Sequence, residues 1–163
     1  MMTTTPSQLP KAKIEEIAEQ FALEVGYDPG SDLVSLVESW GHTVRIAEGD
    51  VPAESLHIDA NGRMEIVVPT YTSRARDCFT IAHEIGHFVL HHEKGGPPER
   101  YNRSGGDLAE VEANWFAAAF LMPADAFITA ALKSPLFRVA SKFGVSESAA
   151  EVRAKSLGIS SPQ

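Results

Sequence analysis

Hydrophobic residues in the first quarter of the chain recur at the spacing of amphipathic helices. The first set begins at Ile14, and Gly26 fits a stop after it. A second, shorter set follows Ser31 and Asp32, either of which can cap a helix, and it ends before Gly41. The pattern therefore predicts helices over residues 14–25 and 33–40, preceded by a loose polar tail at residues 1–10.

The hydrophobic period then changes to one typical of strands. Residues 43–46, 56–59 and 64–68 are short runs rich in β-branched and apolar residues. Asn61-Gly62, between the last two runs, is a strong hairpin signal. We expect these three runs to form a small antiparallel sheet.

From Arg74 onward the pattern is again helical. Helices are predicted over residues 74–92 and 108–121, from Pro123, from Ser134-Pro135, and over 146–157, with a polar loop at 93–106. This order of elements predicts an α+β fold in which helices pack on the small sheet. We expect one domain over residues 1–133 and a helical extension over 134–163 packed on it, with the rhythm of a helix-turn-helix.

Composition narrows the class of protein. Apolar residues make up 44% and charged residues 22%, which is ordinary for a globular protein and excludes a disordered or fibrous one. The longest apolar run, residues 115–122, is too short for a membrane helix. The single cysteine, Cys78, and the lack of a secretory signal pattern indicate the cytoplasm. The net charge of −8 is the opposite of that expected for a nucleic-acid binder.

Candidate chemistry lies in the predicted helix at 74–92, which contains the sequence His-Glu-x-x-His at residues 83–87. His83 and His87 are four residues apart, so both imidazoles lie on one helix face and can bind one tetrahedral ion. Glu84 is rotated by about 100° from His83, so it can reach a metal-bound water without being a ligand. This arrangement is typical of a peptidase in which the glutamate is the general base.

The position of Gly86 supports a functional interpretation. Apolar residues share the histidine face, which indicates that this face is buried, and buried histidines need partners. Glycine costs a helix about 1 kcal/mol relative to alanine, so Gly86 suggests close approach of a backbone or ligand. The alternative is a core helix whose histidines bond to backbone carbonyls.

A third metal ligand is expected from the helix at 108–121. Glu110 and Asn114 lie on one face, whereas Glu112 is turned about 200° from Glu110, so only one of the two acids can face the metal. We favour Glu110 on geometry, with Asn114 hydrogen-bonding a zinc-binding histidine. Glu110 could instead close a capping box with Asp107, and Glu112 could be a solvated surface acid.

Two sequence segments together resemble the ImmA/IrrE family of zinc-dependent metallopeptidases. They are HEIGH at residues 83–87 and EVEANWFAAAFLMP at residues 110–123, and the similarity extends over about residues 43–157. The resemblance implies a zincin-like fold, zinc ligands His83, His87 and Glu110, and Glu84 as the general base. Mn²⁺ also fits two nitrogens and a carboxylate. The longer members of the family have an additional C-terminal sensor-like domain. This sequence, which ends at Gln163, is similar to the short, stand-alone members that lack it.

The resemblance also implies a protein substrate, because family members cleave, or promote cleavage of, helix-turn-helix repressors. Such a substrate is expected to pair with a sheet edge, and residues 64–68 are either that edge or an interior strand. Four residues could stabilise the oxyanion of the transition state: His42, Tyr71, Tyr101 and Arg103. We favour Tyr101 and Arg103, because both lie in the polar loop. His91 and His92 are interpreted as residues that favour a helix C-terminus.

Two other functions remain open at this stage. The chain could bind a repressor without cutting it, although Glu84 has a purpose only in chemistry. The helix-turn-helix rhythm after Ser134 could indicate DNA binding, but Glu147 and Glu151 on the second helix oppose it, and we expect no DNA partner.

Overall fold

The structure of the protein, a computed structural model, describes residues 6–47, 55–69, 73–92, 100–102 and 108–159. Its helices are α1 (Lys11–Val25), α2 (Leu33–Ser39), α3 (Arg74–His87), α4 (Leu108–Leu121), α5 (Ala124–Lys133), α6 (Leu136–Phe143) and α7 (Glu147–Ser156). Its strands are β1 (Thr43–Ile46), β2 (Ser55–Ile58), β3 (Met64–Val68) and β4 (Arg100–Asn102). A π-helical turn, Phe88–His92, continues α3. The predicted α+β class is confirmed.

The sheet is mixed, with strand order β1-β3-β2-β4. The hairpin at Asn61-Gly62 is confirmed, because β2 and β3 pair in antiparallel fashion. The expectation of a wholly antiparallel sheet is wrong, since β1 runs parallel to β3. The loop predicted at 93–106 contains β4, which pairs antiparallel with β2. A three-residue strand is too short to give a hydrophobic period of its own.

The suggestion that residues 64–68 form a sheet edge is wrong, because β3 lies between β1 and β2. The burial pattern agrees with this placement: Met64, Ile66, Val67 and Val68 of β3 are buried, whereas β1 is largely exposed. Within the described residues, the outer edges belong to β1 and β4. A substrate strand would have to pair with one of those edges.

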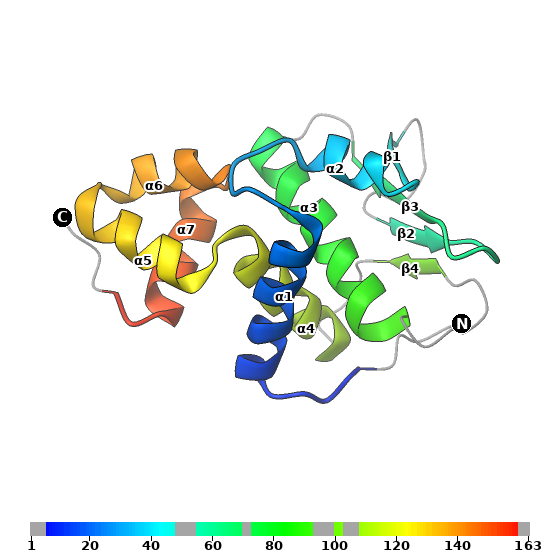
Figure 1. The fold of residues 1–163 in the computed structure, drawn as a ribbon, viewed down its shortest axis with the longest axis horizontal. Coiled ribbons are helices and arrows are strands. Elements are labelled where there is room, and N and C mark those ends of the chain that lie inside the picture. The colour runs from blue at the N-terminus through cyan, green and yellow to red at the C-terminus, as the bar shows by residue number, and fades with distance from the viewer. Residues whose placement is uncertain (1–5, 48–54, 70–72, 93–99, 103–107, 160–163) are drawn as a thin grey trace.

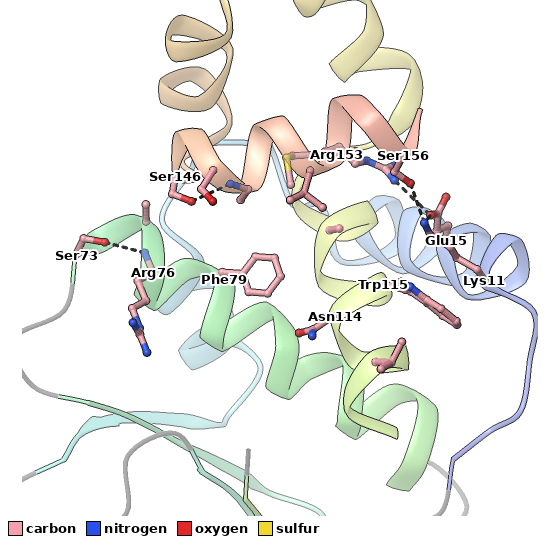
Figure 2. Close-up of a pocket in the computed structure, with 17 residues that line it drawn as sticks. Lys11, Glu15, Ser73, Arg76, Phe79, Asn114, Trp115, Ser146, Arg153 and Ser156 are labelled. Atoms are coloured by element: carbon pink, nitrogen blue, oxygen red, sulfur yellow. Dashed lines mark hydrogen bonds and ion pairs between the residues drawn. The ribbon is translucent and has the colours of Figure 1, made fainter. Parts of the chain in front are cut away.

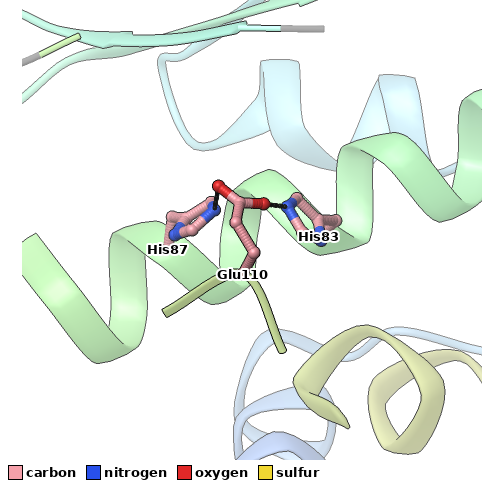
Figure 3. Close-up of side chains that lie close together, drawn as sticks. All are labelled: His83, His87 and Glu110. Carbon is pink, nitrogen blue, oxygen red and sulfur yellow. Dashed lines mark hydrogen bonds and ion pairs between the residues drawn. The ribbon is translucent and has the colours of Figure 1, made fainter. Parts of the chain in front are cut away.

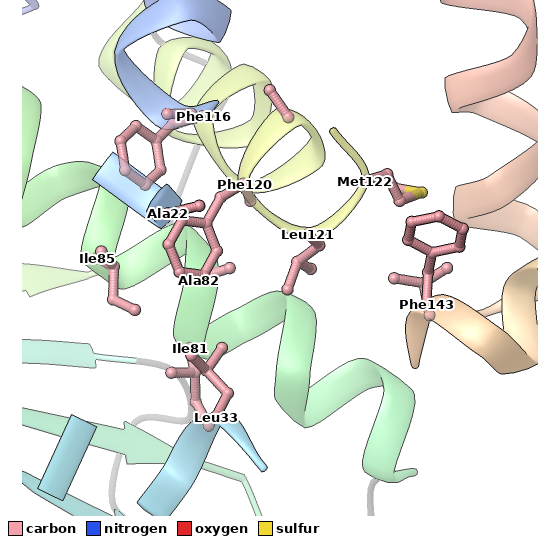
Figure 4. Packing of buried hydrophobic residues seen from close by; sticks show 14 of the residues in the cluster. Ala22, Leu33, Ile81, Ala82, Ile85, Phe116, Phe120, Leu121, Met122 and Phe143 are labelled. Atoms are coloured by element: carbon pink, nitrogen blue, oxygen red, sulfur yellow. The ribbon is translucent and has the colours of Figure 1, made fainter. Parts of the chain in front are cut away.

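Helix α3 lies at the centre of the molecule. Figure 1 shows the strands on one side of α3, and α5, α6 and α7 grouped at the end away from the sheet. Helix α4 packs against α3, and α1 packs against α4. The rings of Phe116 and Phe120, one turn apart on α4, are fully buried near Ala22 of α1 and Ala82 of α3 (Figure 4). Burying a phenylalanine side chain contributes about 1.5–3 kcal/mol, so this layer fixes α4 against α3.

The C-terminal helices contact the rest of the chain through Arg153 of α7, which is 1% exposed. Its Nε donates to the carbonyl oxygen of Met122 at 3.0 Å, and its Nη1 lies 3.4 Å from Glu15 Oε1 of α1. The division into a domain at 1–133 and an extension at 134–163 stays a prediction.

No single helix in the described part of the chain is long and apolar enough to cross a membrane. Helices α4 and α5 reach that length and composition only as a pair, and the pair is bent by 61°.

Candidate metal centre

Helix α3 places two histidines on its buried face. The helix begins after Ser73, whose Oγ accepts a hydrogen bond from the backbone N–H of Arg76 at 3.1 Å. Every residue from Thr80 to His87 is buried. The rings of His83 and His87, one turn apart, have centroids 4.8 Å apart and lie nearly perpendicular. The two imidazoles therefore converge on one side of the helix, as their spacing predicts.

Glu110, in the first turn of α4, lies between the two rings. One carboxylate oxygen is 2.8 Å from His83 Nε2 and the other is 3.1 Å from His87 Nε2 (Figure 3). One ligand atom from each of the three residues lies within 4.8 Å of the others. Glu110 is thus turned toward the histidines, and Asp107, its partner in the alternative capping box, is outside the described residues.

The electrostatics of Glu110 suit a metal ligand. Burial opposes ionisation of its carboxylate, but hydrogen bonds from His83 and His87 outweigh that effect and lower its pKa from 4.5 to about 2. The carboxylate is therefore charged at neutral pH. Two imidazole nitrogens and one carboxylate match the donor set of catalytic zinc sites, which keep a fourth position for water or substrate. The residues present could hold a metal ion.

Asn114 lies one turn beyond Glu110 on α4, as the sequence predicts. Its amide oxygen is 2.8 Å from Nδ1 of His83. An amide oxygen only accepts, so His83 Nδ1 carries a proton. A ring protonated at Nδ1 alone has its lone pair on Nε2, and a bound metal ion would take the place of the hydrogen bond from Nε2 to Glu110. That nitrogen is the one that faces Glu110.

The close approach predicted from Gly86 is confirmed. A Cβ atom built at this position would lie 3.1 Å from Phe116 Cβ and 3.2 Å from the carbonyl oxygen of Ala113. Both are atoms of α4 that sit in the core, so they have little room to move. Glycine allows α3 and α4 to approach closely enough for Glu110 to reach both histidines.

His91 and Glu112 were interpreted wrongly from the sequence. Glu112 is fully buried, so it is not a solvated surface acid, and the side chain of His91 is buried beside it. His91 Nε2 donates to Glu112 Oε1 at 2.9 Å, and His91 Nδ1 is 2.9 Å from Nδ1 of His87. The signal that could have revealed this is the repeat His83, His87, His91, which places a third imidazole on the same helix face.

Burial and hydrogen bonding set the charges of this second pair. Burial lowers the pKa of His91, although the hydrogen bond to Glu112 acts in the opposite direction. The lowered pKa favours the neutral ring. Burial opposes ionisation of Glu112, but hydrogen bonds from His91 and from the backbone of Ser7 and Gln8 give its carboxylate a lowered pKa. The pair is therefore a neutral imidazole beside a carboxylate.

Among the other predicted site residues, Glu84 is fully buried on α3. His42 directly precedes β1, and its Nδ1 accepts the backbone N–H of Met64 at 2.9 Å. Tyr101 belongs to β4, opposite Leu56, but its side chain is outside the described part of the structure. Tyr71 and Arg103 are also outside it. The oxyanion assignment to Tyr101 stays a prediction.

A groove of about 940 Å³ lies beside the metal centre, lined by residues of α1, α3, α4 and α7. The side chains of Phe79 and Asn114 point into it from α3 and α4 (Figure 2). Neither the candidate ligands nor Glu84 line it. Asn114 thus lies between the groove and His83, and the groove is on the opposite side of Asn114 from the candidate metal ligands.

Comparisons with known proteins agree with this arrangement. The sequence model of the peptidase M78 family, described as the IrrE N-terminal-like domain, matches residues 37–155. A solved structure of a Mycobacterium tuberculosis transcriptional regulator is similar at a TM-score of 0.60 and 20% sequence identity, which shows a shared fold. The similarity covers 88% of this chain but 46% of the regulator, so the chain spans about half of that protein's length. No curated protein matches the chain.

Proposed function

We propose, because this chain belongs to the peptidase M78 family of IrrE N-terminal-like domains, that it is a metal-dependent peptidase. The observation that supports this most directly is the contact of Glu110 with both His83 and His87. Three ligand atoms from two packed helices converge there, and the buried Glu84, next to His83 in the chain, is not one of the three. Zinc is the ion that we propose, with Mn²⁺ as the alternative that the same donors accept.

Residues around the candidate metal ligands have separate roles in the proposed reaction. Asn114 and His91 hold the Nδ1 atoms of His83 and His87, so both Nε2 atoms stay directed at the ligand position. A bound divalent ion supplies Lewis acidity, which lowers the pKa of water and polarises a peptide carbonyl. The carboxylate of Glu84 takes a proton from the attacking water and delivers it to the leaving amine. Burial of Glu84 keeps bulk solvent away from that proton transfer.

A helix-turn-helix repressor is the substrate that we propose, and the cytoplasm is the compartment. The choice of a repressor rests on the family resemblance. The similar solved structure is a transcriptional regulator, and that role is known of that protein alone. The half-buried Cys78 is free, which suits a reducing compartment.

The alternative is a regulatory module that binds a repressor or DNA without cleaving it. Helices α6 and α7 are joined at Gly144, in a left-handed conformation, as in a helix-turn-helix. However, α7 exposes Glu147 and Glu151, and its one arginine, Arg153, is buried in contact with Glu15. Exposed carboxylates oppose contact with phosphates, so we favour the peptidase.

Metal content and activity separate these functions. The purified chain is expected to bind zinc in equimolar amount, and His87→Ala to lose it. Glu84→Gln is expected to bind zinc like the wild type but to lose about 10²–10⁴-fold in peptidase activity, the usual contribution of a general base. Metal analysis of the purified chain and mass spectrometry of a candidate helix-turn-helix repressor incubated with it provide the two measurements.

The outcomes are distinct. Fragments that form with the wild type and not with Glu84→Gln support cleavage by this site. A Glu84→Gln protein that still inactivates the repressor, leaving it intact, would favour the binding module. A wild-type chain that binds no metal would refute the proposed function.

A further inference from the structure

Glu112 is a buried carboxylate that the proposed chemistry does not use. It is fully buried, and a charged group in the interior is stable only when it is well paired. Its Oε1 accepts from His91 Nε2 at 2.9 Å and from the backbone N–H of Ser7 at 2.8 Å. Its Oε2 accepts from the backbone N–H of Gln8 at 2.9 Å. Glu112 therefore joins α4, the end of the metal helix and the N-terminal segment.

The hydrogen bonds from Glu112 to the candidate metal site have a fixed direction. A carboxylate accepts, so His91 Nε2 carries the proton that it donates to Glu112. In the neutral ring, His91 Nδ1 is then an acceptor, and His87 Nδ1 must donate to it. A His87 ring protonated at Nδ1 alone has its lone pair on Nε2, the atom that faces Glu110, as binding of a metal ion would require. Glu112 thus stands two hydrogen bonds behind a metal ligand.

The N-terminal segment is shaped for this carboxylate. Gln8 has φ of 62°, and it is the one non-glycine residue with positive φ among those the structure describes. This conformation costs about 1–2 kcal/mol, and it lets two successive backbone N–H groups point at one anion. The side chain of Gln8 is exposed, so the backbone alone makes the contact. Strain of this kind persists only where the surroundings stabilise it.

We propose that Glu112 is a positioning residue that orients His87 through His91 and couples the N-terminal segment at Ser7 and Gln8 to the metal site. The role matches that of Asn114 toward His83, except that it also links a distant part of the chain. The N-terminal segment is then part of the metal centre's support, so displacing it weakens metal binding. This inference rests on the proposed metal site.

The test measures metal binding in full-length variants. Zinc affinity is determined by competition with a chelator, and the visible spectrum of the Co²⁺-loaded protein reports the ligand geometry. Glu112→Gln removes the charge that fixes the His91 proton, and we expect about 10–100-fold weaker zinc binding, as is usual for partners of metal ligands. The Co²⁺ bands are expected to shift as His87 reorients, which a loss of stability alone would not produce.

A second pair of variants examines the N-terminal segment without changing Glu112. Gln8→Pro removes the N–H and cannot adopt positive φ, whereas Gln8→Gly keeps the N–H and favours that conformation. We expect Gln8→Pro to weaken zinc binding about fivefold, the effect of one lost hydrogen bond, and Gln8→Gly to bind like the wild type. This pair also gives the answer if Glu112→Gln does not fold.

Glu110→Gln separates this inference from the proposed function. If the wild type binds zinc and Glu110→Gln does not, the metal site exists. Unchanged affinity and unchanged Co²⁺ spectra in Glu112→Gln, or in Gln8→Pro if Glu112→Gln does not fold, would then overturn the positioning role alone. A wild type without zinc affinity would overturn the proposed function instead.

Discussion

The imidazole of His42 supports the start of β3, and it can do so only when Nδ1 is unprotonated. His42 Nδ1 accepts the N–H of Met64, and the ring packs edge-on against Trp40 and Phe88. Partial burial lowers the pKa of His42 below its usual 6.5. A protonated ring cannot accept this hydrogen bond, so the folded protein favours the neutral form.

His42 should therefore make stability depend on pH. Well above pH 6.5 the His42 ring is neutral in both the folded and the unfolded state. As the pH falls below 6.5, the unfolded chain takes up a proton on this ring before the folded protein does. The free energy of unfolding therefore decreases until the pH reaches the lower pKa of the folded state. Asparagine places an amide oxygen where Nδ1 lies and does not titrate. We expect the wild type to lose up to about 1 kcal/mol more than His42→Asn between pH 8 and 5.5, measured by urea unfolding. Equal losses in the two proteins would contradict this role.

Whole elements are also stabilised by residues distant in sequence. Helix α5 follows Pro123, whose side chain cannot cap it. The carboxylate of Glu19, on α1, accepts the backbone N–H of Ala124 at 2.9 Å and so caps α5 from another helix. A negative charge at a helix N-terminus is favourable in addition to the hydrogen bond.

Removing this cap should destabilise the protein. We expect Glu19→Ala to lower the free energy of unfolding by about 1 kcal/mol, the usual cost of a lost cap. Glu16→Ala is the matched control, because Glu16 is exposed on the same helix and forms only a surface ion pair with Lys13. Denaturant unfolding measures both, and equal effects would show that Glu19 does not act as a cap.

At the scale of the molecule, the loop before α2 anchors the C-terminal helices. Gly30 has φ of 85°, and a Cβ atom there would collide with the carbonyl oxygen of Lys142 on α6. Gly41 has a similar φ of 88° but no atom within 4 Å of such a Cβ. Substitutions at the two glycines therefore distinguish the cost of a positive φ from the cost of disturbing the contact between this loop and α6.

Alanine substitutions use this difference. Both Gly30→Ala and Gly41→Ala are expected to cost about 1–2 kcal/mol from positive φ. Gly30→Ala should cost about 1–3 kcal/mol more, because a backbone atom of α6 must move. Thermal unfolding gives the two totals, and hydrogen exchange should accelerate in α6 only for Gly30→Ala. A larger loss in Gly41→Ala would show that this contact is not important.

The sequence by itself determined the local elements and the core of the candidate site. Helices α1 to α7 follow from apolar spacing and from local signals such as Gly26 and Ser146, because helix geometry depends on neighbours within one or two turns. His83 and His87 were predicted for the same reason. Glu110 was predicted from the face that it shares with Asn114 and from the family resemblance, and the close packing of α3 and α4 at Gly86 brings it to the histidines.

Only the tertiary structure decided which distant groups meet. The parallel pairing of β1 with β3, the strand β4, and the buried pair His91–Glu112 depend on contacts between segments far apart in the chain. Glu112 resembles a surface acid in sequence, and its burial becomes favourable only when His91, Ser7 and Gln8 surround it. A hydrophobic period records which face of an element is buried, but it does not record which partner satisfies a charge there.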